Sequence, residues 1–253
     1  MITAVIHAGG KGTRLREAYP GPKALAPVDG LPLLWYHLQP YMKSELVSSY
    51  VFTLMHDSEL VKEYAAGLSN EQGFTMSSIV EPKPLGRAGS MRLGIDEGMI
   101  DPDVPCIMSH PDDLIPVNIK ELIDHAEDVV GKGKTLFIVM AKNTPNPFGI
   151  GVTKESQDVI ELDYFLEKPE LPLIPNHYAN TGMALYMPEA LKEFKTAPLD
   201  RKTHPEHEII PRLVKDRKVA VFLIEHWISV NYASDYEAVN EMGKEKLLEY
   251  LGV

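Results

Sequence analysis

Residues 2–14 read ITAVIHAGGKGTR, and a Pro22-Lys23 pair follows a few positions later. The apolar, β-branched start of this stretch predicts a buried strand over residues 2–8, which the glycines end. Glycine lets the backbone pass close to a ligand and turn successive N–H groups toward it, which suits phosphate. Arg14 adds a planar fork for phosphate oxygens, and Lys23 adds a compact positive charge. The stretch therefore predicts an α/β fold with an anionic ligand at the end of its first strand.

Two better-known glycine loops fit this stretch less well. A P-loop needs G-x-x-x-x-G-K-[ST], and the Gly-Lys-Gly-Thr order at residues 10–13 breaks that pattern. A dinucleotide fingerprint needs G-x-G-x-x-G, and no third glycine follows Gly12 at the required spacing. The bland alternative is a tight turn that carries solvated basic residues. Glycines, Thr13, Arg14 and a Pro-Lys pair directly after a buried strand favour phosphate binding over that alternative.

Short apolar runs alternate with amphipathic stretches through the first half of the chain. This rhythm predicts a mostly parallel, Rossmann-like sheet with helices on both faces. The expected strands are residues 2–8, 49–54, 74–80, 104–109 and 135–141, and the expected helices are 33–41, 58–67, 88–98 and 119–129.

The second half changes character, because three strand-like runs at 148–153, 159–166 and 178–187 follow one another closely. They predict a β-rich elaboration over the C-terminal edge of the sheet, where ligands of open α/β sheets bind. We expect a single domain over residues 1–253, in which residues 1–143 and 144–253 share one core.

Composition sets limits on the partners of the protein. The 253 residues carry 25 Lys and Arg against 36 Asp and Glu, a net charge of −11. This charge argues against a nucleic-acid partner, although a pocket can still be locally basic. The one cysteine, Cys106, lies in an apolar run and is expected to be buried. With no signal-peptide pattern and no apolar run of about 20 residues, we expect a cytoplasmic protein with no membrane partner.

The glycine loop, Pro22-Lys23 and Gly30-x-Pro32 together resemble the signature of the sugar-1-phosphate nucleotidylyltransferases, among which the mannose-1-phosphate guanylyltransferases are the most similar. Further similar segments follow in the family's order: residues 84–89, Asp112 after a strand, Phe148-Gly149, Glu167-Lys168-Pro169, Asn180-Thr181-Gly182 and residues 227–236. The resemblance implies an enzyme that joins an NTP to a sugar 1-phosphate, with Mg²⁺ as cofactor, and releases an NDP-sugar and pyrophosphate. It also implies that the β-rich half binds the sugar, and it is compatible with a homo-oligomer.

The resemblance implies a role for each matching residue. Arg14 would hold the triphosphate, Lys23 would bridge the reacting phosphates, and Asp112 would be the Mg²⁺ ligand. The implied nucleotide-binding residues are Ala8, Gly9, Gly10, Gly12, Thr13, Glu81 and Gly86. The implied sugar-phosphate-binding residues are Gly149, Glu167, Lys168, Asn180 and Thr181.

Two departures from the family pattern concern charge. Ser229 stands where the family has its second metal carboxylate, so the metal would be held by Asp112 and phosphates. Asn231 or Asp235 could replace the missing carboxylate. Asp113 is a rival to Asp112 as the first ligand.

The second departure is Arg87, which replaces a usual threonine. Its side chain could contact a phosphate or Glu81. It could equally lie on the surface at the start of a helix.

Glu81 bears on the base of the nucleotide. Guanine presents two adjacent donors, N1–H and the 2-amino group, and a carboxylate can accept both. Uracil presents one donor between acceptors, so Glu81 favours GTP, while CTP and ATP stay open. A solvated glutamate at a strand end is the alternative. The sugar stays open among mannose, glucose and heptose.

Two other functions compete with an active sugar-phosphate nucleotidylyltransferase. One is a nucleotidyltransferase for a non-sugar phosphate, against which Glu167-Lys168-Pro169 argues. The other is a weakly active or inactive nucleotide-sugar-binding regulatory subunit, which Ser229 suggests. We interpret His7 as a core histidine and residues 204–208 as the polar start of a helix, because Pro211 replaces the second histidine of H-E-x-x-H.

Overall fold

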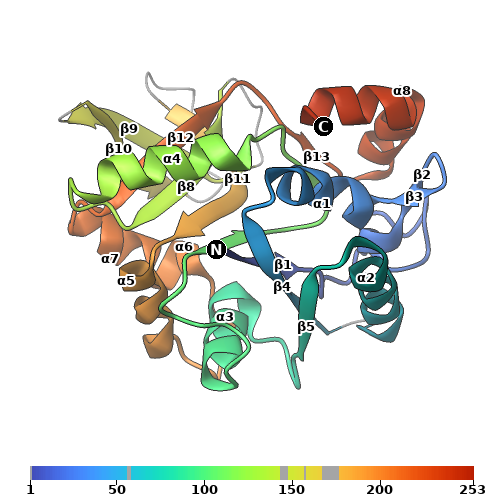
Figure 1. The fold of residues 1–253 in the computed structure, drawn as a ribbon, viewed down its shortest axis with the longest axis horizontal. Coiled ribbons are helices and arrows are strands. Elements are labelled where there is room, and N and C mark those ends of the chain that lie inside the picture. The colour runs from blue at the N-terminus through green and yellow to red at the C-terminus, as the bar shows by residue number, and fades with distance from the viewer. Residues whose placement is uncertain (1, 56–57, 143–147, 157, 167–176) are drawn as a thin grey trace.

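Nine strands form one sheet in the order β5-β4-β1-β6-β11-β8-β12-β10-β9 (Figure 1). The computed structural model describes residues 2–55, 58–142, 148–156, 158–166 and 177–253. Strands from both halves of the chain therefore lie in the same sheet.

The first four strands pair in parallel around β1 (Ile2–His7). The chain passes from β1 to one side through β4 (Val47–Leu54) and β5 (Thr75–Val80), and then returns to the other side at β6 (Cys106–Ser109). The direction of winding changes between β1 and β6, and ligands of open α/β sheets bind at such a point, outside the carboxyl ends of the strands.

The remainder of the sheet is mixed rather than mostly parallel, so that part of the expectation is wrong. Strand β11 (His177–Tyr186) is antiparallel to both of its neighbours, β6 and β8 (Leu136–Ala141). Strand β12 (Val219–Ile224) is parallel to β8, whereas β10 (Val159–Leu166) and β9 (Ile150–Ser156) are antiparallel. The short connection from β9 to β10 leaves no room for a crossover, which forces antiparallel pairing. The α/β class itself is confirmed.

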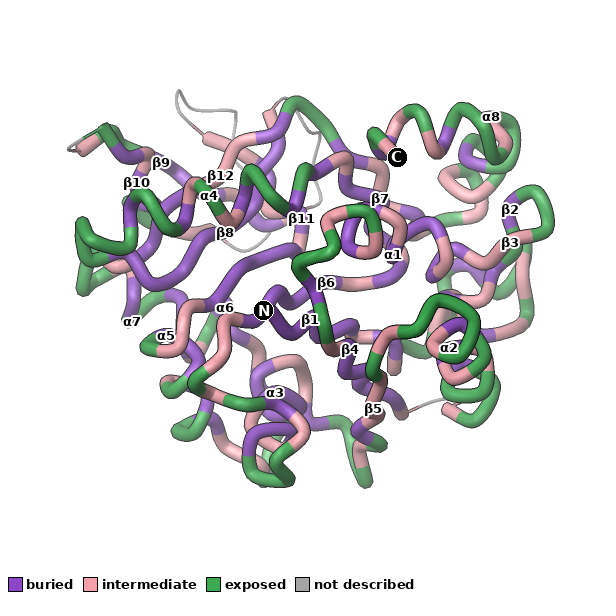
Figure 2. Tube along the Cα trace, viewed as in Figure 1, coloured by how far each residue is buried: buried purple, intermediate pink, exposed green. Residues whose placement is uncertain are grey.

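Alternate residues of the buried strands pack against two different sets of helices. In β8, residues 137, 139 and 141 pack with α1 (Leu33–Ser44), α2 (Ser58–Gln72) and α4 (Ile119–Val130). Residues 136, 138 and 140 pack with α3 (Gly86–Asp96), α5 (Pro188–Lys192), η2 (Glu193–Thr196) and α7 (Ile210–Lys215). Figure 2 shows the strands buried in the middle and the outer sides of the helices exposed.

The last helix, α8 (Ala233–Leu251), packs beside the glycine loop. A third apolar cluster joins it to Leu15, to η1 (Lys23–Leu25) through Ala26, and to the small β2–β3 sheet (Pro27–Val28, Leu31–Pro32). Just before it, β13 (Ile228–Ser229) pairs with β7 (Asp113–Leu114), and Ser229 lies opposite Asp113. This pairing brings residues 229–231 beside Asp112. Among the described residues, none of the helices combines the length and the apolar character needed to cross a membrane.

Candidate functional site

A cavity of about 750 Å³ lies where the parallel strands β1, β4, β5 and β6 end. The glycine loop follows β1, Glu81 follows β5, and Asp112 follows β6, so the sheet order alone brings these segments together. Ten residues expected to bind the nucleotide or to act in catalysis line this cavity: Ala8, Gly9, Gly10, Gly12, Thr13, Arg14, Lys23, Glu81, Gly86 and Asp112.

The cavity is locally basic although the chain is acidic. Five lysine and arginine side chains line it, against the two carboxylates of Glu81 and Asp112. The five are Lys11, Arg14, Lys23, Arg87 and Lys202. A concave, positively charged surface of this kind concentrates anionic ligands.

The three glycines of the loop differ in what they do. A Cβ added at Gly9 would lie 2.9 Å from the backbone nitrogen of Met55, so this position has no room for a side chain. Gly12 has a φ of +60°, a backbone conformation that favours glycine. A Cβ added at Gly10 would meet no described atom within 4 Å, so the surface of Gly10 is open to the cavity.

Lys23 lies at the centre of a small polar cluster. Its ammonium group donates to Asp112 Oδ2 at 2.6 Å and to Asn231 Oδ1 at 3.1 Å. Asn231 Nδ2 in turn donates to Ser229 Oγ at 2.7 Å. A carboxylate oxygen and an amide oxygen thus converge on one cation. Mg²⁺ prefers oxygen donors, one or two of them carboxylates, with waters and phosphates completing its sphere, so this donor set fits it.

The described residues contain no group of three or more His, Cys, Asp and Glu side chains that could hold a metal ion. Asp113, the rival to Asp112, is 9% exposed and does not line the cavity. Its Oδ1 accepts a hydrogen bond from Trp227 Nε1 at 3.3 Å. Burial and the neighbouring Asp112 carboxylate raise the pKa of Asp113 well above its usual range.

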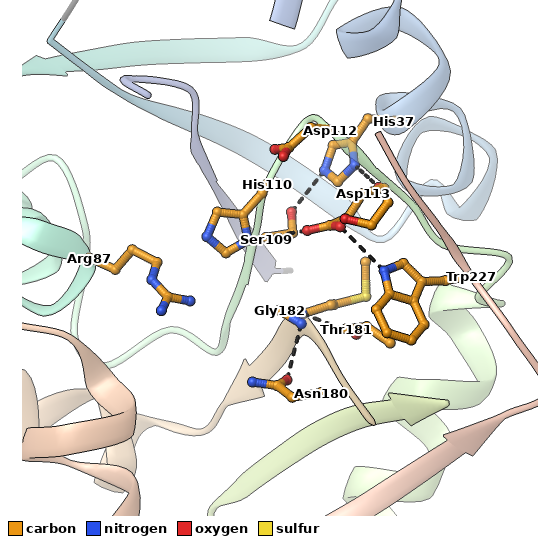
Figure 3. A network of polar contacts seen from close by, with 12 residues as sticks. His37, Arg87, Ser109, His110, Asp112, Asp113, Asn180, Thr181, Gly182 and Trp227 are labelled. Carbon is orange, nitrogen blue, oxygen red and sulfur yellow. Dashed lines mark hydrogen bonds and ion pairs between the residues drawn. The ribbon is translucent and has the colours of Figure 1, made fainter. Parts of the chain in front are cut away.

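A chain of buried hydrogen bonds holds the loop that carries Asp112 (Figure 3). His37 Nδ1 bonds the carbonyl oxygen of Asp113 at 2.9 Å, so this nitrogen carries the proton. Burial lowers the pKa of His37 to about 4, so the neutral ring accepts at Nε2 from Ser109 Oγ at 2.9 Å. Tyr41 donates to the same Ser109 oxygen at 2.7 Å. Helix α1 and strand β6 thereby fix the backbone next to Asp112.

Glu81 lines the cavity and also closes the first turn of α3. Its Oε2 accepts from the Leu85 N–H at 2.8 Å, and its Oε1 accepts from Ser90 Oγ at 2.5 Å. Gly86 has a φ of +73°, and an added Cβ would lie 2.2 Å from the carbonyl oxygen of Thr203. Gly86 is therefore required for the loop before α6 (Pro205–Glu208) to pack against α3.

Arg87 pairs with a residue that the sequence did not indicate. Its Nη2 lies 2.8 Å from Glu206 Oε2, and its Nε donates to His204 Nδ1 at 3.4 Å, so Glu81 is not its partner. Helix α6 begins directly after His204, yet His204 and Lys202 line the cavity.

Three histidines gather in the same wall of the cavity: His7, His110 and His204. The ring centroids of His7 and His110 lie 5.7 Å apart, and His7 Nδ1 bonds the Thr53 hydroxyl at 2.7 Å. Burial, His110 and Arg87 lower the pKa of His7, and burial and Arg87 lower that of His204 to about 4. His7 and His110 end or follow adjacent parallel strands, which is the signal that sequence analysis missed.

Arg14 is supported by a residue outside the loop. Its guanidinium carbon lies 5.5 Å from the ring centroid of Tyr232, which is 46% exposed. This cation–π contact holds the flat face of the Arg14 guanidinium at the N-terminus of α8.

Three of the expected sugar-side residues, Gly149, Asn180 and Thr181, are described by the structure, and they do not line the cavity. Gly149 accepts from the Asn180 N–H at 2.8 Å, and Asn180 Oδ1 accepts from the Gly182 N–H at 3.0 Å. Thr181 is 2% exposed, and its hydroxyl donates to the carbonyl oxygen of Val139 at 2.8 Å. Glu167 and Lys168 lie outside the described residues.

The Asn180-Thr181-Gly182 motif forms an irregularity in β11, where the register with β8 shifts. Gly182 has a φ of +83°, and an added Cβ would lie 2.9 Å from His110 Nδ1. The bulge brings this segment against the loop that carries Asp112 (Figure 3).

The sequence matches a family of known proteins. The family model described as "Nucleotidyl transferase" matches residues 3–244. The chain is 28% identical over 238 residues to the mannose-1-phosphate guanyltransferase of Saccharomyces cerevisiae, covering 93% of this chain and 63% of the relative. It is 26% identical over 238 residues to the mannose-1-phosphate guanyltransferase of Debaryomyces hansenii, covering 93% and 62%. The chain thus spans less than two thirds of the length of these relatives.

Solved structures share the fold. HddC from Yersinia pseudotuberculosis, complexed with GMP-PN, matches with a TM-score of 0.72 at 20% identity, over 95% of this chain and 99% of that one. A UDP-glucose pyrophosphorylase complexed with UDP-glucose matches with a TM-score of 0.76 at 15% identity, over 95% and 98%.

Proposed function

We propose that this chain, which belongs to the nucleotidyl transferase family, transfers a nucleotidyl group from an NTP to a sugar 1-phosphate. The products are an NDP-sugar and pyrophosphate. One observation carries the proposal: Arg14, Lys23, Asp112 and the open surface of Gly10 face one basic cavity at the ends of β1 and β6.

The reaction needs little proton chemistry from the protein. An oxygen of the sugar phosphate, already ionised near neutral pH, attacks the α-phosphorus in line. A new O–P bond forms, the bond between the α- and β-phosphates breaks, and its electrons leave with pyrophosphate. Catalysis then depends on holding two anions together and on stabilising charge on the leaving group.

The basic residues of the cavity suit these two tasks. Arg14 would grip the triphosphate and the departing pyrophosphate, and Lys23 would lie between the reacting phosphates. Asp112 would hold Mg²⁺, which, when bound, neutralises phosphate charge. On the sugar side, Gly149, Glu167, Lys168, Asn180 and Thr181 remain the proposed contacts.

GTP is the proposed nucleotide. Glu81 lines the cavity, and its two internal hydrogen bonds use two of the roughly four acceptor positions of a carboxylate, which leaves positions for N1–H and the 2-amino group of guanine. The guanyltransferase names of the curated relatives support the same choice. The sugar stays open among mannose, glucose and heptose.

The test is release of pyrophosphate with Mg²⁺ from GTP, UTP, dTTP, CTP and ATP, each with a panel of sugar 1-phosphates. We expect GTP to give the highest rate. A strong preference for UTP or dTTP would contradict the assignment of Glu81 while leaving the transferase intact. Transfer to alditol phosphates but not to sugar 1-phosphates would favour the non-sugar alternative.

A regulatory subunit is the second candidate, because Ser229 replaces a metal carboxylate expected from the family pattern. Tight binding of an NDP-sugar without release of pyrophosphate under any of these conditions would establish it. Both Arg14 and Lys23 are present in the cavity, which favours the enzyme over this candidate.

A further inference from the structure

The loss of a carboxylate at position 229 leaves open how a cation is held opposite Asp112. The segment after β13 provides an answer in Asn231, which lines the cavity. Its Oδ1 is 3.1 Å from Lys23 Nζ, and the same ammonium is 2.6 Å from Asp112 Oδ2. Both oxygens therefore already share a positive charge, that of Lys23.

The orientation of the Asn231 amide follows from its two partners. An ammonium group has only donors, so the amide atom that faces Lys23 must be the oxygen. On its other side, the amide nitrogen donates to Ser229 Oγ at 2.7 Å. The serine hydroxyl thus holds the amide with its oxygen directed toward the cation position.

The other oxygens nearby are engaged elsewhere. Asp235 Oδ2 accepts from the backbone N–H groups of Asn231 and Tyr232, both at 2.8 Å, and so closes the start of α8. Asp113 is buried against Trp227.

We infer that the side-chain oxygen of Asn231, oriented by Ser229, is the second protein ligand of the divalent cation that Asp112 binds. The inference deepens the proposed function, because it concerns the cation of that reaction, but it makes a claim about binding that needs no turnover. An amide oxygen is an accepted ligand for hard cations and carries no charge, so the site holds one negative charge fewer than a site with two carboxylates.

One consequence concerns Lys23. Its ammonium occupies the position between the two oxygens, so an incoming cation must displace it. Once displaced, the same ammonium is free to meet phosphate oxygens.

The experiment measures Mn²⁺ binding to the intact chain, without substrates, from the loss of the free-ion signal in electron paramagnetic resonance. Mn²⁺ serves because it takes carboxylate and carbonyl ligands as Mg²⁺ does. We expect Asn231→Ala to weaken binding by about tenfold or more, and Ser229→Ala to weaken it by less. Asn231→Asp should bind Mn²⁺ more tightly than wild type, and so should Lys23→Met, because a competing cation is gone.

Asn240→Ala is the matched control, since Asn240 is an exposed asparagine of α8 that does not line the cavity and whose amide donates to the carbonyl oxygen of Tyr236 at 2.9 Å. It should bind Mn²⁺ as wild type does, and circular dichroism should show that each variant is folded. If Asn231→Ala does not fold, the opposite signs expected for Asn231→Asp and Ser229→Ala decide the question.

The inference is overturned if Asn231→Ala binds Mn²⁺ as tightly as wild type, if Asn231→Asp binds no tighter, or if wild type leaves the Mn²⁺ signal unchanged. Pyrophosphate release is measured on the same samples. A wild-type chain that shows the expected Mn²⁺ pattern and no turnover would defeat the proposed function alone.

Discussion

At the scale of single residues, the site depends on charged side chains whose partners come from distant parts of the chain. Arg14 rests on Tyr232, Lys23 bonds Asp112 and Asn231, and Arg87 pairs with Glu206. The first member of each group stands out in the sequence because of its motif. Asp112 stands out as well, and Asn231 is a candidate from its place in residues 227–236. Nothing in the sequence pairs Tyr232 with Arg14 or Glu206 with Arg87, because those contacts form only in the fold.

Arg14→Lys tests whether the planar fork matters beyond its charge. Lysine keeps the charge but loses two-point contact with phosphate and the face that lies over Tyr232. We expect kcat/KM for the NTP to fall by about tenfold or more, which corresponds to roughly 1.4 kcal/mol. Steady-state pyrophosphate release measures it. Arg16→Lys is the matched control, because Arg16 is exposed and does not line the cavity. Equal effects of the two changes would contradict the assignment.

His37 predicts how stability depends on pH. Its pKa is about 4 when folded, below the roughly 6.5 of a free histidine, so the unfolded chain binds more protons between these values. The contribution of neutral His37 to the free energy of unfolding is fully present above pH 6.5. It is lost as the pH falls toward 4, which lowers the free energy of unfolding by on the order of 3 kcal/mol.

The measurement is urea unfolding of wild type and His37→Asn at pH 7 and at pH 4.5. Asparagine keeps a donor near the Asp113 carbonyl but does not titrate. The variant should therefore lose less stability between the two pH values than wild type does. Identical losses would show that His37 is not the buried neutral group described here.

At the scale of elements, the glycine loop separates a folding requirement from a binding requirement. Gly9 packs on the backbone of Met55, whereas Gly10 faces open space. Gly10→Ala should therefore fold with nearly wild-type stability and yet weaken NTP binding, because the methyl group stands where a phosphate must approach. Gly9→Ala should lose stability as well.

Thermal unfolding and nucleotide titration by calorimetry measure the two effects. Gly67→Ala, in the middle of α2 with open space around it, is the control and should leave nucleotide binding unchanged. Unchanged nucleotide affinity in Gly10→Ala would mean that no ligand approaches this loop.

Elements differed in how well local pattern predicted them. Periodicity and glycine located most parallel strands and helices of the first half to within a few residues, because most are buried runs with a clear end. The helix expected over 58–67 is the exception, because α2 continues through Gly67 to Gln72. Local pattern did not predict that β11 lies between β6 and β8, since pairing between strands far apart in the sequence leaves no local signal. The Asn180-Thr181-Gly182 motif predicts sugar contacts at Asn180 and Thr181, but the packing of Gly182 against His110 appears only in the folded sheet.

At the scale of the whole molecule, sheet order decides what the site contains. The predicted cationic and glycine residues meet because β1, β4, β5 and β6 run in parallel and end at one edge. The same order brings His7, Arg87, His110 and His204 together from four separate segments. The glycine loop can be predicted from its chemistry. The grouping of His7, His110 and His204 cannot, because it depends on which strand ends are neighbours.

We expect this edge of the sheet to bind an NTP between the glycine loop and Asp112, and the decisive measurement is a crystal structure of the chain with Mg²⁺ and a non-hydrolysable GTP analogue. The triphosphate should lie against Gly10, with Arg14 and Lys23 on its oxygens and Lys23 moved away from Asn231. A nucleotide bound elsewhere, with Arg14 facing solvent and Lys23 still paired to Asp112, would contradict it.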